Sequence, residues 1–380
     1  MNLLVLHWGA YTHSDILQTF SALHIKYNIV EYIFEDKNND DRFLHWFTGK
    51  LKETQYDAVF SVNYFPLIAQ SCAALRVKYL SWCYDCPLNV RHIEETLGLD
   101  TNYVFFFDRM QAKHYQDSGF TNIYHLPLAI NPSRLANTFL TCDEREHYSS
   151  DVAFVGKLYH STFSTLLSSF DDYTRGYLTA LANMQLRVYG AYFIEDLLTE
   201  ELLSNCSISL GCPIAKEELA YSLATYITHN ERLAILSGIS QKHMLKLYSN
   251  DGSSLLPLAV HQGYVRYFSD MPKVFMSSRI NINITVKNTS SGMPLRVLDI
   301  LGCGGFLLSN YQPELAEYFI PDTDYVYYES IEDAIAKVDF YLAHDDLRRS
   351  IAQNGCRKCR ENFNYEMQLY SMLRSAGLPL

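Results

Sequence analysis

A polar turn, Asn288–Gly292, leads into apolar sequence with helical spacing and is the stretch best suited to binding an anion. Pro294 suits the first position of a helix, where the backbone N–H has no partner inside the helix. Ser290, Ser291 and Gly292 then lie at or before the N-cap, where backbone N–H groups are free and the positive end of the helix dipole lies. We therefore expect an anion site here that suits a nucleotide diphosphate, with Ser291, Gly292 and Met293 among its donor-binding residues.

The same predicted helix carries two charged residues close to that turn. Arg296 and Asp299 are three positions apart and so share a face of the helix. Arg296 could neutralise phosphate charge, and Asp299 could accept hydrogen bonds from hydroxyl groups. An ordinary ion pair on the helix surface is the alternative interpretation.

A second candidate for phosphate contact follows the run Asp151–Val155, which we expect to be a buried strand. Gly156 would let a phosphate approach the backbone closely, and Lys157 would add positive charge, although a solvated lysine is the ordinary outcome at a loop. No G-x-G-x-x-G motif follows the first expected strand, which argues against a classical dinucleotide dehydrogenase.

Two loops in the first half of the chain carry candidate acid–base groups. One contains His13 and Asp15, and the other contains Asp85. His13 or Asp85 could serve as a general base or accept a hydrogen bond from a hydroxyl group. The structural alternatives are that Asp15 caps a helix and that Asp85 forms a turn before Pro87.

The elements that must position these residues alternate between short β-branched or aromatic runs and helical periodicity, which predicts α/β architecture with parallel sheets. The expected strands are Leu3–His7, Asn28–Ile33, Ala58–Ser61, Lys78–Trp82, Tyr103–Phe107, Ile123–Leu126, Asp151–Val155, Leu186–Tyr189, Ile280–Ile284, Phe306–Ser309 and Tyr325–Tyr328. Between about 161 and 249 the sequence is mostly helical.

We expect two domains, because 380 residues exceed the size of a single hydrophobic core. The predicted boundaries are 1–131 for an N-terminal Rossmann-like domain, 132–150 for a linker, 151–363 for a C-terminal Rossmann-like domain with a helical insertion, and 364–380 for a helix that can pack back on the first domain.

Composition excludes several classes of protein. The chain is 48% hydrophobic and 19% charged, as in folded globular proteins, and its net charge of −11 disfavours nucleic acid as a partner. The first apolar run is too short for a signal peptide or a membrane span. Nine scattered cysteines favour a reducing, cytoplasmic compartment, and we expect no metal site from the two distant C-x-x-C pairs.

Seven segments of the chain are distinctive when taken together. In the C-terminal half they are Phe154–Gly156, Asn281–Thr285, Gly292–Gly302 and Tyr325–Ser330. In the N-terminal half they are Phe60–Pro66, Ser81–Pro87 and Phe107–Arg109. Through these segments the chain resembles the CgeB-type spore-maturation glycosyltransferase-like family, which is related to the retaining GT-B glycosyltransferases.

The resemblance implies a GT-B fold, in which two Rossmann-like domains face each other across a cleft, and a metal-independent reaction. It implies a nucleotide-sugar donor, a UDP-sugar above all, bound by the second domain, and acceptor contacts in the first. Asp299 matches the second of two acidic residues eight apart in retaining relatives, which usually holds the ribose. Ser291 stands in place of the first, so the retaining and the inverting outcome both remain open.

The functional hypothesis is hexosyl transfer, with Gly156, Lys157, Ser291, Gly292, Met293, Arg296 and Asp299 on the donor side and Asp85 and His13 on the acceptor side. The acceptor could be a protein, a surface glycan or a small molecule. Two alternatives stay open. One is a nucleotide-sugar epimerase, and the other is a degenerate GT-B subunit that binds a partner without catalysis.

Overall fold

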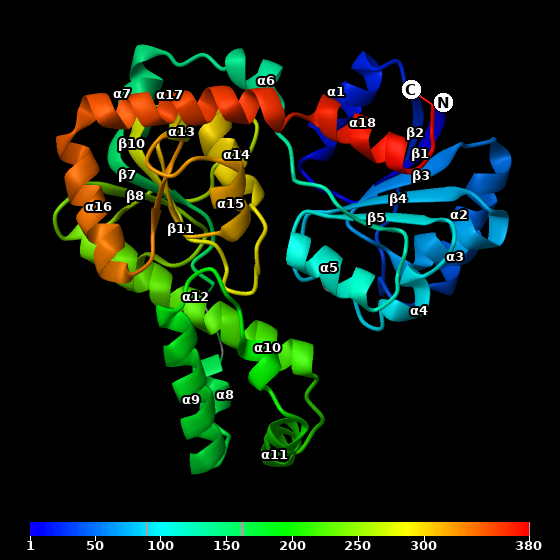
Figure 1. The fold of residues 1–380 in the computed structure, drawn as a ribbon, viewed down its shortest axis with the longest axis horizontal. Coiled ribbons are helices and arrows are strands. Elements are labelled where there is room, and N and C mark those ends of the chain that lie inside the picture. Colours follow the sequence, from blue (N-terminus) through cyan, green and yellow to red (C-terminus); the bar gives the residue numbers. More distant parts are fainter. Residues whose placement is uncertain (89, 160, 162, 380) are drawn as a thin grey trace. The chain divides into compact units, whose positions relative to one another are not determined.

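The computed structural model describes residues 1–88, 90–159, 161 and 163–379. The chain forms two compact units. The first comprises Met1–Pro132, Gly292–Leu298 and Arg360–Leu380, and the second comprises Ser133–Ser291 and Asp299–Cys359. Each unit has a parallel sheet flanked by helices (Figure 1), which confirms the predicted pair of Rossmann-like α/β domains.

The sheet of the first unit has the strand order β2-β1-β3-β4-β5-β6 among the described residues. Its strands are β1 (Asn2–His7), β2 (Lys26–Glu31), β3 (Ala58–Val62), β4 (Lys78–Cys83), β5 (Asn102–Phe106) and β6 (Ile123–His125). All five residues of β3 are buried, as expected where helices cover both faces of a parallel sheet. The predicted strands of this half are therefore confirmed, with ends that shift by one or two residues.

The helices of the first unit join successive strands, and one comes from the far end of the chain. They are α1 (His13–Ala22), α2 (Asp41–Glu53), α3 (Pro66–Leu75), α4 (Glu94–Leu97), α5 (Arg109–Asp117) and α18 (Tyr365–Ser375). The segment before α18 is tied to the end of the first half by reciprocal backbone hydrogen bonds between Ile130 and residues Phe363 and Tyr365. Lys78 Nζ donates to Ala376 O at the other end of α18.

The sheet of the second unit has the order β12-β11-β10-β7-β8-β9 in the described part of the chain. Its strands are β7 (Ser150–Val155), β8 (Leu245–Tyr248), β9 (Val260–His261), β10 (Ser278–Asn283), β11 (Leu307–Asn310) and β12 (Val326–Tyr328). The helices that lie within the predicted linker or pack near this sheet are α6 (Pro132–Ala136), α7 (Cys142–Tyr148), α13 (Met271–Ser277), α14 (Leu295–Gly302), α15 (Pro313–Tyr318), α16 (Ile331–Ala343) and α17 (Asp345–Asn362).

The prediction of a strand at Leu186–Tyr189 is wrong. Helix α9 (Asp172–Arg187) continues through the first half of that run, because Leu178, Leu181 and Gln185 recur at helical spacing and are buried on one face. The strand beside β7 is instead β8, which we did not predict. Its central Lys246 is buried and donates from Nζ to His147 O, so a charged residue interrupts an otherwise apolar strand.

Between β7 and β8 lies a helical segment with its own hydrophobic core. It consists of α8 (Phe163–Ser168), α9, α10 (Ile194–Leu197), α11 (Glu200–Leu210) and the first half of α12 (Lys216–Ser240). In Figure 1, α12 continues from this segment along the second sheet. Gly238 allows close packing of α12 on α16, since a Cβ there would lie 2.4 Å from Ile335 Cδ1.

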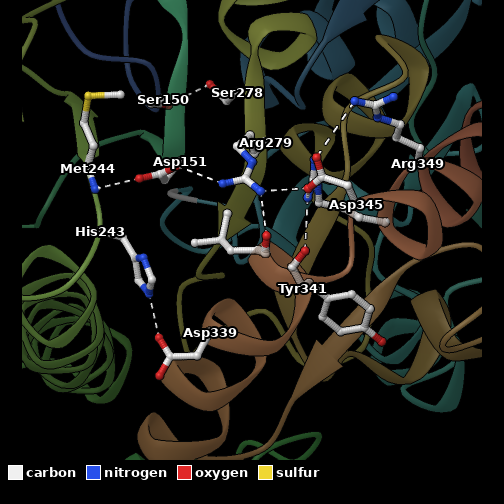
Figure 2. A network of polar contacts seen from close by, with 12 residues as sticks. Ser150, Asp151, His243, Met244, Ser278, Arg279, Asp339, Tyr341, Asp345 and Arg349 are labelled. Atoms are coloured by element: carbon white, nitrogen blue, oxygen red, sulfur yellow. Dashed lines mark hydrogen bonds and ion pairs between the residues drawn. The ribbon is translucent and has the colours of Figure 1, made fainter.

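Arg279, near the amino end of β10, ties the amino edge of the second sheet to α17 (Figure 2). Its guanidinium donates to Asp151 Oδ1 on β7 at 3.2 Å, to Leu342 O at 2.6 Å and to Asp345 Oδ1 at 2.7 Å. Hydrogen bonds from Arg348 and then from Arg279 hold the pKa of Asp345 well below its ordinary value. This network therefore holds the amino ends of the neighbouring strands β7 and β10, at the opposite edge of the sheet from their carboxyl ends.

Candidate functional site

The carboxyl ends of β7 and β10 lie side by side, because these strands are neighbours in a parallel sheet. Gly156 directly follows β7, and its N–H donates to Tyr248 O at 3.0 Å. The side chain of Lys157 is exposed. The structure therefore brings these two predicted residues to the edge where ligands bind in open α/β sheets. Their contact with phosphate stays a prediction.

Arg232 lies directly beside Gly156 and was not predicted. A Cβ at Gly156 would lie 4.0 Å from Arg232 Nη1. The Arg232 guanidinium is buried and lies over the rings of Phe154 and Tyr159, 5.2 and 4.7 Å from their centroids. It donates to Lys157 O from one nitrogen and to Ile284 O from two others. One side chain thus joins the loops that follow β7 and β10.

The loop that follows β10 also contains a buried ion pair. Lys287 Nζ lies 3.1 Å from Glu231 Oε1, and the two side chains are 5% and 0% exposed. The ammonium group also lies 3.9 Å from the centre of the Tyr189 ring, and the Lys287 N–H donates to Thr228 Oγ1 at 3.0 Å. Lys287 is therefore held both at its backbone N–H and at its ammonium group.

Ser291, at the end of that loop, is engaged with the start of α15. Its hydroxyl donates to Glu314 Oε1 at 2.7 Å, and the Glu314 N–H donates back to Ser291 O at 3.1 Å. Both residues are buried. The reciprocal pair fixes the turn that precedes α14.

The expectation that the amide of Gly292 is free is wrong. Within the first unit its N–H donates to Asp108 Oδ2 at 2.9 Å, while Asp108 Oδ1 accepts from Gln111 N and so caps α5. A Cβ at Gly292 would lie 2.8 Å from the Phe107 ring and 2.9 Å from Asp108 Cα. Only glycine fits this close approach, so packing explains the residue type without a ligand.

The other predicted residues around α14 lie in its first two turns or just before them. Met293 is buried and Arg296 is half-buried. Asp299 is 3% exposed, and its Oδ1 accepts a hydrogen bond from the Tyr267 hydroxyl at 2.8 Å. The guanidinium of Arg134 lies over the same tyrosine ring, 5.5 Å from its centroid. Tyr267 is thus a partner of Asp299 that the sequence did not indicate.

His13 and Asp85 come to the carboxyl edge of the first sheet, after β1 and β4, with β3 between those strands. Asp85 is exposed, and its Oδ2 accepts from Asn63 Nδ2 at 2.6 Å. Asn63 has a φ of 63° and also accepts from the N–H groups of Tyr84 and Asp85. Asparagine tolerates this left-handed conformation better than most residues, which accounts for its place at the end of β3.

His13 is buried at the start of α1, with its ring 4.6 Å from that of His7. Burial, and next the charge on His7, lower the pKa of His13 from 6.5 to about 4. Its imidazole is therefore neutral at pH 7. Asp15, predicted as a cap, is also buried and instead accepts from Asn131 Nδ2 at 3.0 Å.

The depressed pKa of His13 predicts a loss of stability in acid. The unfolded chain binds the His13 proton more readily than the folded chain does. The contribution of His13 to the free energy of unfolding is therefore fully present above pH 6.5 and is lost as the pH falls toward 4. The loss from this group amounts to about 3 kcal/mol at most. We expect the His13→Gln variant to lose less stability than the wild type over this pH interval. Urea unfolding at several pH values measures the difference, and His45→Gln, at an exposed position on α2, should keep the wild-type slope.

Within the described part of the chain, no three His, Cys, Asp or Glu side chains gather in a way that could hold a metal ion. Among the described helices, none combines the length and apolar character needed to cross a bilayer.

The two Rossmann-like units of the chain match solved structures of the GT-B fold over nearly the whole length, so the chain has this fold. A glycosyltransferase from Rickettsia africae is 10% identical, with 99% of this chain and 97% of that chain covered and a TM-score of 0.63. HepE from Anabaena, solved in complex with UDP-glucose, is 8% identical, with 99% of each chain covered and a TM-score of 0.61.

A sucrose-phosphate synthase from Thermosynechococcus elongatus is 11% identical, with 98% of each chain covered and a TM-score of 0.59. Residues 216–374 match a protein-family model described as glycosyl transferase-like. That match includes α12, the loop after β10 and α14, which carry most of the site described above. No match is found among curated proteins.

Proposed function

We propose that this protein is a glycosyltransferase that moves a hexose from a nucleotide-sugar donor, a UDP-sugar above all, to an acceptor hydroxyl. The observation that carries the proposal is the family match over residues 216–374, because it includes Arg296 and Asp299 of α14. The GT-B fold and the complex of HepE with UDP-glucose support it.

The proposed donor site uses backbone at Gly156, the charges of Lys157 and Arg296, and the carboxylate of Asp299 as the ribose acceptor. Ser291, Gly292 and Met293 contribute the turn that sets where α14 begins. As the bond between the sugar and the diphosphate breaks, negative charge grows on the leaving group, and positive groups positioned there lower the barrier. We propose that the reaction is metal-independent and retains configuration.

On the acceptor side the proposal assigns two residues. The exposed Asp85 carboxylate can accept the proton of the attacking hydroxyl, and its hydrogen bond from Asn63 fixes its orientation. The neutral His13 imidazole can accept a hydrogen bond at pH 7, since its pKa of about 4 keeps it unprotonated. The new bond then joins the acceptor oxygen to the anomeric carbon of the sugar.

A thermal-shift screen with UDP, UDP-glucose and other nucleotide sugars tests the proposal. A ligand that binds the native state stabilises it by about 2.7 kcal/mol at a concentration one hundred times its Kd. We expect UDP and at least one UDP-sugar to raise the melting temperature, and we expect slow release of free sugar in the absence of an acceptor. Mass spectrometry should show no epimerised nucleotide sugar.

A second candidate function is a non-catalytic GT-B subunit, which is favoured by Ser291 standing where retaining relatives have an acidic residue. On this reading no nucleotide sugar would be hydrolysed or would raise the melting temperature. That combined result would contradict transfer and favour the binding subunit.

A further inference from the structure

Helix α12 presents three residues of one face to the two loops of the proposed donor site. Thr228, Glu231 and Arg232, here called the α12 brace, follow one another at helical spacing, so their side chains point the same way. Arg232 bonds to Lys157 O and Ile284 O, and Glu231 and Thr228 bond to Lys287. The brace therefore contacts the backbone or side chains of both loops.

The brace lies at the midpoint of a helix that is anchored at both ends. Leu219, Leu223 and Ile227 belong to the core of the helical segment, whereas Ile235 and Ile239 belong to the core of the second sheet. A continuous helix of 25 residues spans about 37 Å and bends little when packed at both ends. The position of the brace is consequently fixed by two separate hydrophobic cores.

Arg232 joins the two loops in a way that charge alone cannot reproduce. Its planar guanidinium reaches carbonyl oxygens on both loops at once, while the Phe154 and Tyr159 rings hold it in place. A lysine ammonium at the same position would keep the charge but lacks the fixed fork of donors that spans the two loops.

We propose that Arg232 is a positioning residue that holds the loops after β7 and β10 in the arrangement that receives a nucleoside diphosphate, and that the helical segment serves to fix it there. This inference rests on the proposed function. It adds that the two loops receive the diphosphate part of the donor. Arg232 acts through the loops and does not itself touch the donor.

The experiment compares Arg232→Lys and Arg232→Met with a matched control, Arg279→Lys. Both arginines join β7 or its loop to β10 or its loop. Arg232 does so at the carboxyl edge of the sheet. Arg279, which Figure 2 shows with Asp151, does so at the amino edge. The full-length proteins are titrated calorimetrically with UDP and with uridine, and their melting temperatures are measured. The ratio of the two dissociation constants isolates the contribution of the diphosphate.

We expect both Arg232 variants to bind UDP about 10- to 100-fold more weakly, because loops that are no longer held together lose at least one hydrogen bond to the charged diphosphate, and one such bond accounts for a change of this size. Uridine binding should stay nearly unchanged. Arg279→Lys should lower the melting temperature but leave UDP affinity as in the wild type. Wild-type UDP affinity in Arg232→Lys would overturn the inference, and so would an equal loss of UDP and uridine binding.

A milder variant guards against misfolding. Thr228→Val keeps the shape of the side chain but removes the acceptor of the Lys287 N–H, so it should weaken UDP binding selectively and to a smaller extent. If the Arg232 variants do not fold, unchanged UDP affinity in Thr228→Val overturns the inference. Failure of the wild type to bind UDP would overturn the proposed function and this inference together, whereas wild-type binding with unaffected variants overturns the inference alone.

Discussion

Replacing Arg296 with alanine is expected to weaken UDP binding by about 10- to 150-fold, since a hydrogen bond to a charged group contributes about 1.5–3 kcal/mol. Arg296 is half-buried in the first turn of α14, so partial exclusion of water strengthens its interaction with an anion. Isothermal titration calorimetry with UDP at constant salt measures the loss. Uridine affinity should change little, because the side chain is proposed to contact the diphosphate and not the base.

Arg175→Ala provides the matched control for this prediction. Arg175 and Asp172 form an i, i+3 ion pair on α9, the same spacing as Arg296 and Asp299 but on the helical segment. Removing an exposed pair of this kind should leave UDP affinity unchanged. If Arg296→Ala behaves like Arg175→Ala, then Arg296 belongs to an ordinary surface pair and leaves the proposed site.

The sequence could predict the parallel sheets because their buried strands are short apolar runs. Leu3–His7 consists mainly of leucine and valine, Ala58–Ser61 contains a valine and a phenylalanine, and both fall within observed strands. The same pattern wrongly predicted a strand at Leu186–Tyr189, because helix α9 ends there in residues of similar character. It missed β8 because Lys246 interrupts that strand, and the hydrogen bond from its ammonium to His147 O, a tertiary contact, offsets the cost of burying it there.

The candidate site could be predicted only where a residue follows a strand or begins a helix. Gly156 and Arg296 are of this kind. Arg232 and Glu231 lie in the middle of a long helix, and their partners Ile284 and Lys287 are more than fifty positions away. Nothing local distinguishes such residues from solvated charges on a helix face, because the fold alone brings them together.

The ion pair between Glu231 and Lys287 carries the prediction with the largest effect on stability. Changing Glu231 to glutamine should lower the free energy of unfolding by about 3–5 kcal/mol, because the Lys287 ammonium would remain buried without its carboxylate. Urea unfolding at pH 7, followed by circular dichroism, should show the loss as a lower midpoint with an unchanged slope. Lys50→Gln, which breaks an exposed pair with Glu53 on α2, should change the midpoint little.

The double variant Glu231→Leu with Lys287→Met distinguishes the cost of an unpaired charge from the value of the pair. Removing both charges relieves the desolvation of each, so the double variant should be more stable than either Glu231→Leu or Lys287→Met alone. Tyr189 would then pack against the methionine side chain, since its ring already lies against the lysine ammonium. Additive losses would mean instead that the two charges do not depend on one another. The double variant can regain the wild-type free energy of unfolding and still bind UDP weakly. That result would mean that an apolar pair is sufficient for folding, and that the buried ion pair is needed for the shape of the loop after β10.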